Sequence, residues 1–164
     1  DSIIFAKKLT NIYKTDSNIE KIMDRGFVGE PKKIDPSTII NQCKKGSIPV
    51  ITPLGKDNNT TYNINADTAA GAIAGALKAS RLLMLTDVAG VIDENKELIL
   101  ELKVKKAEKL ISDGVIVGGM IPKIKTCIDA LKNGVDKAVI LDGRVENAII
   151  LELFTEEGIG TLIN

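Results

Sequence analysis

The chain has 164 residues, the size of one ordinary domain, and its 44% hydrophobic and 27% charged residues fall in the globular range. Its 22 basic and 22 acidic residues cancel, which argues against nucleic-acid or membrane binding, since both need a basic excess. The absence of histidine excludes histidine–metal sites, serine–histidine triads and histidine acid–base catalysis.

The cysteines and the start of the chain bear on its setting. Cys43 and Cys127 are too few for a disulfide scaffold and predict a reducing, cytoplasmic environment. The chain opens at Asp1 within an apparent strand, which predicts the later part of a longer protein. No apolar run approaches the roughly 18 residues of a membrane span.

The first quarter of the chain predicts few regular elements. Residues 3–6 and 27–29 are short apolar runs typical of strands, whereas the polar stretch 9–25 predicts an irregular excursion. Asp35 and Pro36 indicate a helix start, and Gly46 follows that helix.

Strands and helices alternate from residue 48 onward. We expect strands at 48–52, 82–85, 138–141 and 161–163, with helices at 66–79, 104–113, 122–133 and 149–154. Short, continuously apolar strands between helices predict a three-layer α/β sandwich, with a mainly parallel sheet covered by helices on both faces. Ligands in such folds bind at the carboxyl ends of strands.

The first polar segment at such an end is residues 62–67, just before an Ala-rich helix. Asn63, Asn65 and Asp67 combine amide and carboxylate groups near unpaired backbone N–H groups, which suits an amide- or carboxylate-bearing ligand. The structural alternative is that Asn65 caps the helix and Asp67 complements its dipole.

A second segment follows the strand at 82–85. Thr86 and Asp87 end this strand, and a loop with Gly90 comes next. Asp87 is placed to hold a ribose hydroxyl or a neighbouring lysine. The alternative is a simple aspartate turn.

The third segment runs from Gly114 to Lys123, where Gly118 and Gly119 lead into a helix. Lys123 lies in the first helical turn, where a cation is unfavourable by about 0.3–1 kcal/mol. A bound phosphate would reverse that sign. The alternative is a lysine that extends into solvent. The glycine pair matches neither the Walker pattern nor GxGxxG.

The sequence resembles the acetylglutamate kinases of the amino acid kinase superfamily. The resemblance rests on YNINADTAAGAIAGAL, LLMLTDVAGV, LISDGVIVGGMIPK and ILDGRVENAIILELFTEEGIGTLI. It runs from about residue 26 to 164 and extends weakly to residues 1–9. It implies phosphorylation of the side-chain carboxylate of N-acetyl-L-glutamate by ATP with Mg²⁺, in arginine biosynthesis.

Roles for individual residues follow from the resemblance. Asn63 would bind acetylglutamate, Asp67 would orient catalytic lysines, and Lys123 would neutralise charge on the phosphoryl group in transfer. No dedicated carboxylate cage for the metal is expected, because the phosphates hold it. The resemblance implies nucleotide contacts by Thr86, Asp87, Val88, Gly90, Val91, Val115, Ile116, Val117, Gly118, Gly119 and Met120.

The resemblance also implies how the chain is organised. Residues 1–47 would be the remnant of an amino-acid-binding half, and residues 48–164 would form the nucleotide-binding domain. The family's N-terminal part carries a glycine-rich loop with a second catalytic lysine. We therefore expect little or no kinase activity from these 164 residues alone. The resemblance also implies that the intact protein is a homo-oligomer, a dimer or a hexamer.

The last segment bears on regulation by arginine. Glu152 and Gly158 resemble positions of the arginine-sensitive members and are candidate regulatory residues. Those members usually carry histidine where Val139 stands, and often where Asn147 stands, so the pattern here is incomplete.

Two other functions remain open at this point. One is a different kinase of the same superfamily that acts on aspartate, glutamate or carbamate. Asn63 is the residue that we expect to distinguish these substrates. The other is a nucleotide- or amino-acid-sensing module without catalysis, which would not need Lys123.

Overall fold

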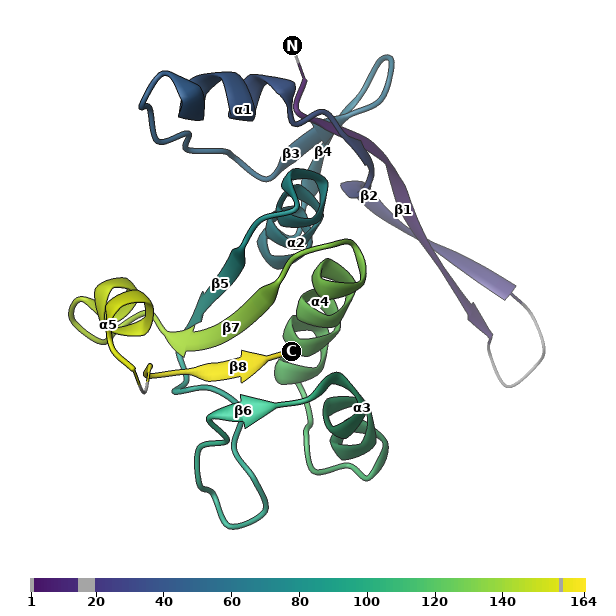
Figure 1. The fold of residues 1–164 in the computed structure, drawn as a ribbon. Coiled ribbons are helices and arrows are strands. Elements are labelled where there is room, and N and C mark those ends of the chain that lie inside the picture. Colours follow the sequence, from purple (N-terminus) through teal and green to yellow (C-terminus); the bar gives the residue numbers. More distant parts are fainter. Residues whose placement is uncertain (1, 15–19, 157) are drawn as a thin grey trace. The chain divides into compact units, whose positions relative to one another are not determined.

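Strands and helices alternate along the chain in the computed structural model, which describes residues 2–14, 20–156 and 158–164 (Figure 1). For residues 11–14 and 20–24 it describes the backbone only. Two compact units form, Asp1–Ile73 and Ala74–Asn164, and each is described by itself. The boundary that we expect between the two functional halves, at residues 47/48, is not the boundary between these compact units, and it stays a prediction.

The first unit is a small closed barrel of four strands in the order β1-β2-β4-β3. The β1–β2 and β3–β4 pairs are antiparallel, whereas β1–β3 and β2–β4 are parallel. Their bounds are β1 Ile4–Lys14, β2 Glu20–Ile34, β3 Leu54–Lys56 and β4 Thr61–Ile64.

The two long strands alter one expectation from the sequence. The strands predicted at 3–6 and 27–29 are confirmed, because β1 and β2 contain them. The irregular excursion predicted over 9–25 is wrong for its described residues, which continue both strands. Two strands can pair although their side chains are polar, as long as neither face of the pair has to be buried in a core. The rest of that stretch, residues 15–19, lies outside the described residues.

The barrel core forms where alternate residues of its strands point inward. Ile4, Ala6, Tyr62 and Ile64 pack there with Ala69 of helix α2 (Ala66–Leu77). The barrel is so narrow beside Tyr62 that a Cβ on Gly29 would lie 2.6 Å from the tyrosine Cβ. Glycine is therefore required at that point of β2.

Helix α1 (Ser37–Lys44) begins one residue later than an Asp35 cap would place it, because Pro36 is the N-cap and no side chain caps the helix. The Asp35 carboxylate accepts a hydrogen bond from the Ser37 N–H at 3.0 Å, just before the helix. The strand predicted at 48–52 is wrong: this segment has no strand assignment, and β3 begins only at Leu54. A strand needs a neighbour to pair with, and no described segment supplies one here.

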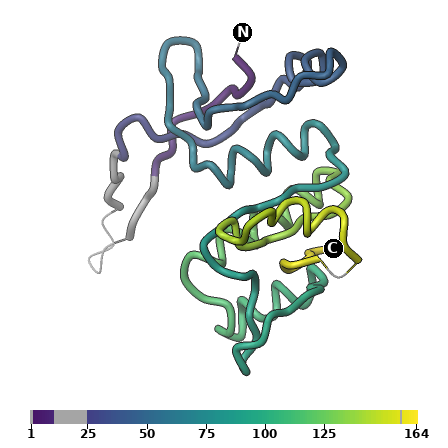
Figure 2. Tube along the Cα trace, turned by 90° about the vertical axis from the view of Figure 1, so that its left-hand side faces the viewer, coloured from purple at the N-terminus to yellow at the C-terminus, as the bar shows by residue number. Residues whose placement is uncertain are grey.

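The second unit is built on a four-stranded sheet in the order β5-β7-β8-β6. The β5–β7 and β6–β8 pairs are parallel, and β7–β8 is antiparallel. The trace in Figure 2 runs from teal to yellow through this unit, with β8 near the C-terminus. The bounds are β5 Arg81–Thr86, β6 Glu101–Leu102, β7 Lys137–Asp142 and β8 Thr161–Ile163.

Helices cover both faces of this sheet. On one face Val139 and Leu141 of β7 pack with Ala148 of α5 (Ala148–Phe154). The alternate residues of β7 point to the other face, where α4 (Met120–Lys132) contacts β7 and β5. Helix α3 (Val104–Ser112) packs beside α4. The expected α/β fold is therefore confirmed.

None of the helices in the described part of the chain is long and apolar enough to cross a bilayer.

Strand β7 ends in a turn held by a bidentate ion pair. Asp142 accepts hydrogen bonds from Arg144 Nε and Nη2 at 2.9 and 2.8 Å, and from the Arg144 backbone N–H at 2.9 Å. The guanidinium contact, followed by the backbone contact, lowers the pKa of Asp142 to about 2. A carboxylate that is 15% exposed is thus kept ionised at the end of the sheet.

We predict that Arg144→Gln raises the pKa of Asp142 toward 3.8, stopping short of it because the backbone N–H contact remains. In the native protein this carboxylate stabilises the fold at pH values above 3.8, and the contribution is lost as the pH falls through about 2. Carboxyl carbon NMR titration measures the pKa directly. Lys125→Gln, the control, removes one positive charge elsewhere and should leave the pKa of Asp142 unchanged. A pKa near 3.8 for Asp142 in the native protein would contradict the prediction.

Candidate functional site

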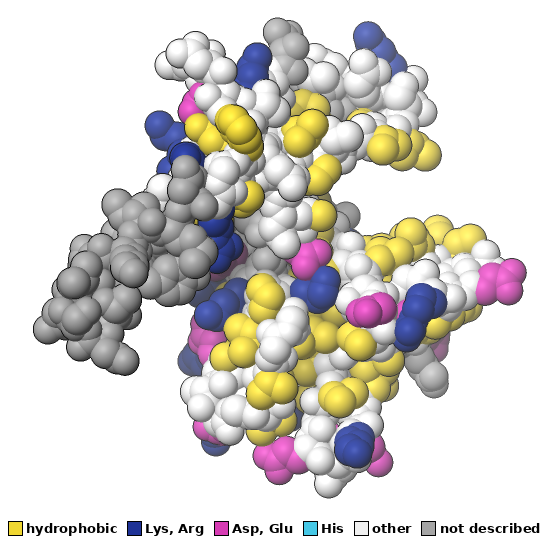
Figure 3. All heavy atoms as spheres, turned by 180° about the vertical axis from the view of Figure 1, so that it is seen from behind, with side chains coloured by type: hydrophobic (Ala, Val, Ile, Leu, Met, Phe, Trp, Pro, Cys, Tyr) yellow, Lys and Arg dark blue, Asp and Glu magenta, His cyan; other side chains and the backbone are white. Residues whose placement is uncertain are grey.

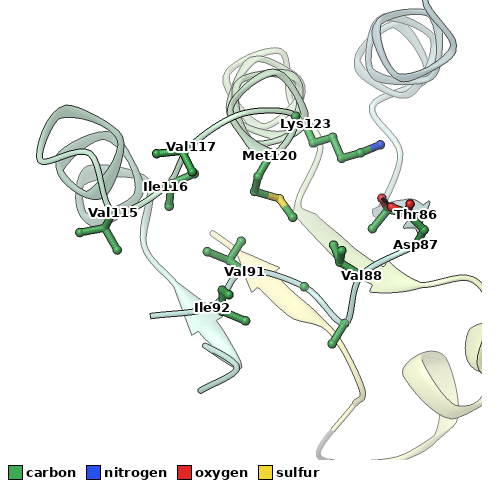
Figure 4. A pocket seen from close by; sticks show the side chains of 13 residues that line it. Thr86, Asp87, Val88, Val91, Ile92, Val115, Ile116, Val117, Met120 and Lys123 are labelled. Atoms are coloured by element: carbon green, nitrogen blue, oxygen red, sulfur yellow. Dashed lines mark hydrogen bonds between the residues drawn. The ribbon is translucent and has the colours of Figure 1, made fainter. Parts of the chain in front are cut away.

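A cavity of about 400 Å³ lies in the second unit, between two segments distant in the sequence. One is the loop 86–92 that follows β5, and the other is the stretch 115–123 that leads into α4 (Figure 4). Its lining residues are Thr86, Asp87, Val88, Ala89, Gly90, Val91, Ile92, Val115, Ile116, Val117, Gly119, Met120 and Lys123.

The fold positions these segments through the end of β5 and the start of α4. Thr86 pairs with Asp142 in the register of the parallel β5–β7 pair, and the Gly143 N–H donates to the Thr86 carbonyl at 2.8 Å. Gly118 has φ +60°, a left-handed conformation that suits glycine, and it directly precedes Gly119, the N-cap of α4. Lys123 therefore lies in the first turn of that helix, half-buried at the cavity.

The cavity has an apolar body and a polar end. Val88, Val91 and Met120 face its interior in Figure 4. In the same view Lys123 extends toward Thr86 and Asp87, and the Thr86 hydroxyl contacts the Asp87 carboxylate at 3.3 Å. Such a cavity suits a ligand with a flat apolar group and an anionic group, since a helix N-terminus and an ammonium both attract negative charge.

One residue that fixes the cavity wall was missed by the sequence analysis. The hydroxyl oxygen of Thr161, fully buried on β8, accepts a hydrogen bond from the Val91 N–H at 2.8 Å. A Cβ on Gly90 would lie 2.6 Å from the same oxygen. The only signal in the sequence was a hydroxyl residue within an apolar strand, and nothing linked it to a loop seventy positions earlier.

The structure brings together most residues that the resemblance assigned to the nucleotide. Gly118 is the exception, because it does not line the cavity and acts through its backbone conformation. Ala89 and Ile92 line the cavity although they were not predicted. Whether a nucleotide binds these residues stays a prediction.

The first unit holds the other candidate residues. Asn63 is exposed on β4, between Val28 of β2 and Leu54 of β3. Asn65 caps α2 by accepting a hydrogen bond from the Thr68 N–H at 3.1 Å, as the structural alternative expected. Asp67 lies half-buried in the first turn of the same helix. The substrate role of Asn63 and the catalytic role of Asp67 stay predictions.

A second cavity, of about 270 Å³, contains the candidate regulatory residues. Glu152 is buried and accepts hydrogen bonds from the Ile159 and Gly160 N–H groups at 2.9 and 3.3 Å. A Cβ on Gly158 would lie 2.8 Å from the Glu152 carboxylate, so this glycine leaves room for it. The cavity is lined by Arg81, Leu100, Glu101, Lys137, Val139, Glu152, Thr155, Glu156, Gly158, Gly160 and Leu162.

Among the described residues, no three cysteine or acidic side chains cluster closely enough to hold a metal ion.

Several curated proteins with similar sequences are named acetylglutamate kinase. The chain is 56% identical to an acetylglutamate kinase of Rhodospirillum centenum and 58% identical to one of Gluconobacter oxydans. The matches cover 99% and 98% of this chain, but 54% and 55% of those proteins. The chain thus spans about half the length of the curated relatives it matches.

Solved structures with the same fold include an N-acetylglutamate synthase of Neisseria gonorrhoeae, complexed with coenzyme A and L-arginine. Its TM-score is 0.86 at 27% identity, and the match covers 99% of this chain and 36% of that one. A carbamate kinase of Giardia aligns with a TM-score of 0.66 at 19% identity, over 99% of this chain and 60% of that one, which shows the fold alone.

The model of the amino acid kinase family matches residues 3–142, most of the chain. The fold, the cavity at the carboxyl end of β5 and the named relatives agree with that match, and the chain belongs to the amino acid kinase family.

Proposed function

We propose that this chain is the nucleotide-binding part of an acetylglutamate kinase. The complete protein then transfers the γ-phosphoryl group of ATP to the side-chain carboxylate of N-acetyl-L-glutamate, in arginine biosynthesis. The observation that carries the proposal is Lys123, half-buried in the first turn of α4 at the polar end of an apolar cavity.

The cavity accounts for both parts of a nucleotide. Valine, isoleucine and methionine side chains suit a purine base, because they exclude water from its faces. The start of α4 and the Lys123 ammonium suit the phosphates. Mg²⁺ enters as part of the ATP substrate, held largely by the phosphate oxygens.

The reaction requires positioning and charge neutralisation more than proton transfer. A carboxylate oxygen of acetylglutamate attacks the γ-phosphorus while its bond to the bridging oxygen of ADP breaks, which gives an acyl phosphate. In this proposal Lys123 stabilises the negative charge that develops on the transferring group and on ADP. A protein without histidine can perform this chemistry, because no proton has to be taken from a carboxylate.

The amino-acid substrate is assigned to the first part of the chain. Asn63 offers an exposed amide on β4, and Asp67 would orient lysines from the first turn of α2. The relatives at 56–58% identity favour acetylglutamate over aspartate, glutamate or carbamate. Retention of Lys123 disfavours a sensor without catalysis. The functional boundary at residues 47/48 belongs to this proposal.

We also propose a cytoplasmic location and a homo-oligomeric complete protein, a dimer or a hexamer. The location is supported by the two cysteines, which no disulfide joins: Cys43 is exposed and Cys127 is buried in α4.

We predict that Lys123→Met weakens Mg²⁺·ATP binding by the 164-residue chain about tenfold, equivalent to about 1.4 kcal/mol. The cause is the loss of an ammonium beside the phosphates, and isothermal titration calorimetry measures it. Lys125→Met removes a lysine that is exposed on the same helix and does not line the cavity, so its affinity should not change. Equal losses in both variants would reject Lys123 as a phosphate ligand.

For the complete protein, ADP release should be at least tenfold faster with N-acetyl-L-glutamate than with aspartate, glutamate or carbamate. A coupled ADP-release assay across these acceptors tests it. The 164-residue chain alone should form no acyl phosphate, because one lysine cannot replace the missing substrate and phosphate contacts. Preference for another acceptor would favour a sibling kinase, and acyl phosphate from the chain alone would refute the inactivity.

A second proposal concerns regulation: L-arginine acts through the cavity that contains Glu152 and Gly158. The carboxylates of Glu101, Glu152 and Glu156 line it together with the cationic groups of Arg81 and Lys137, which suits an amino acid that carries both positive and negative groups. A related synthase with 27% identity was solved with L-arginine. Val139 is buried in β7 and gives this cavity an apolar wall in place of a histidine.

We predict that L-arginine inhibits the complete protein and that Glu156→Gln raises the half-inhibitory concentration several-fold by removing one carboxylate from the cavity wall. Glu146→Gln is the control, since Glu146 is exposed and does not line the cavity. Activity that stays constant over an arginine titration would contradict this regulation. It would agree with Val139, in place of the usual histidine, preventing inhibition by arginine.

A further inference from the structure

The loop that follows β5 is held against β8 by a side chain rather than by a ladder of strand pairs. The hydroxyl oxygen of Thr161 accepts the Val91 N–H at 2.8 Å, and the Val91 carbonyl accepts the Ile99 N–H at 2.8 Å. Val91 is 1% exposed and Thr161 is 0% exposed, so both partners are shielded from water. Both backbone groups of Val91 are therefore fixed, although this residue belongs to no strand.

Thr161 reaches the loop because of its place on β8. Leu162 packs with Val139 and Leu141 on the face of the sheet that α5 covers. Alternate residues of a strand point to opposite faces, so Thr161 points to the face that α4 covers. In the described part of the chain, Thr161 and Glu152 are the buried polar residues. A buried hydroxyl costs free energy unless it is hydrogen-bonded, and the N–H of the loop supplies the bond.

Gly90 allows the loop to come this close. It has φ +154°, a backbone conformation that residues with a side chain rarely adopt. A Cβ at this position would lie 2.6 Å from the Thr161 hydroxyl oxygen and 2.8 Å from Leu98 Cδ1. The loop backbone thus lies directly against Thr161, and a larger residue would push it away. We call the contact of Gly90 and Val91 with Thr161 the loop anchor.

The loop anchor supports one end of the cavity of about 400 Å³. Val91 and Ile92 lie at one end of this cavity in Figure 4, whereas Lys123 and Asp87 lie at the other. The polar end is carried by the first turn of α4 and by the end of β5. The two ends of the cavity therefore have separate supports, and the anchor holds the apolar one.

The apolar end presents uncovered side chains. Hydrophobic side chains reach the surface of the second unit (Figure 3). At the cavity, Val88 is 42% exposed and Ile92 is 50% exposed. Such a wall binds a flat base well only if it already has its bound shape, because part of the binding free energy is otherwise lost to ordering it.

We propose that Thr161 is a positioning residue for the nucleotide base, because its hydroxyl holds residues 88–92 in the conformation that contacts the base. Thr161 does not line the cavity and acts through Gly90 and Val91. The inference rests on the nucleotide site proposed above. Loss of the loop anchor should weaken the contacts to the base and leave the phosphate contacts of Lys123 in place.

The first test separates the base from the phosphates by isothermal titration calorimetry on the 164-residue chain. Thr161→Val keeps the side-chain shape but leaves the Val91 N–H buried without an acceptor. Its affinity for Mg²⁺·ATP should fall about tenfold. Its affinity for Mg²⁺·tripolyphosphate, which has no base, should not change. Thr161→Ser keeps a hydroxyl and should retain most of the affinity for Mg²⁺·ATP.

Two further variants complete the set. Thr38→Val is the matched control: it removes an exposed hydroxyl on α1 and should change neither affinity. Gly90→Ala tests the loop anchor from the loop side, and it keeps the proposal testable if Thr161→Val does not fold. The added Cβ meets the Thr161 hydroxyl, so Mg²⁺·ATP binding should weaken and Mg²⁺·tripolyphosphate binding should not.

Amide hydrogen exchange of Val91 measures the loop anchor without any ligand. The exchange should be roughly tenfold faster in Thr161→Val than in the native chain, because the N–H exchanges once it has left its acceptor. Thr161→Ser should exchange at close to the native rate. An unchanged rate in Thr161→Val would show that the hydroxyl does not hold the loop, and it would overturn the proposal.

The calorimetric results distinguish this inference from the proposed function. A native chain that binds neither Mg²⁺·ATP nor Mg²⁺·tripolyphosphate would reject the nucleotide site and this inference with it. Native Mg²⁺·ATP binding that Thr161→Val leaves unchanged would overturn the role of Thr161 alone. Equal losses for both ligands in Thr161→Val would overturn that role too, because they would indicate general damage to the fold instead of a displaced base wall.

Discussion

The parallel pairing of β5 with β7 is the constraint on which the candidate nucleotide site depends. Six residue pairs hold the two strands in register, from Arg81 with Lys137 to Thr86 with Asp142. Four consecutive residues of β7 are buried, and full burial of the larger three, Val139, Ile140 and Leu141, contributes about 1.5–3 kcal/mol for each side chain. Because the strands end together, the loop after β5 and the turn after β7 must meet at one edge of the sheet.

That edge gains its chemistry from elements that pack onto the sheet. Helix α4 contacts both β5 and β7, which brings its first turn, and so Lys123, to the cavity beside the loop 86–92. Thr161 of β8 then fixes that loop by accepting the Val91 N–H inside the core. The Asp142–Arg144 pair keeps its two charges engaged with each other at the same edge. A cation at a helix N-terminus is unfavourable by itself, and a bound polyphosphate turns this arrangement into an attractive one.

Much of this was predictable from the sequence, because the local signals agreed with the fold. The structure confirms that glycines follow α3 and α4 and that the apolar runs form β5 and β7. It also confirms that Lys123 lies in a first helical turn. The strand predicted at 48–52 is absent because strand pairing depends on a neighbour that the local sequence does not reveal. Thr161 was missed because its partner, Val91, lies seventy positions away. The strands within the polar stretch 9–25 were missed because their side chains gave no apolar pattern.

The proposed site for Mg²⁺·ATP is the cavity between the loop 86–92 and the start of α4. Replacing Mg²⁺ by paramagnetic Mn²⁺ makes the bound nucleotide visible by NMR, because amides near the metal lose their signals. Mn²⁺·ATP should broaden the amide signals of Thr86, Asp87, Gly119 and Met120 first, and excess Mg²⁺·ATP should restore them. Broadening confined to other amides, such as those of Gly158 and Gly160 at the second cavity, would contradict it.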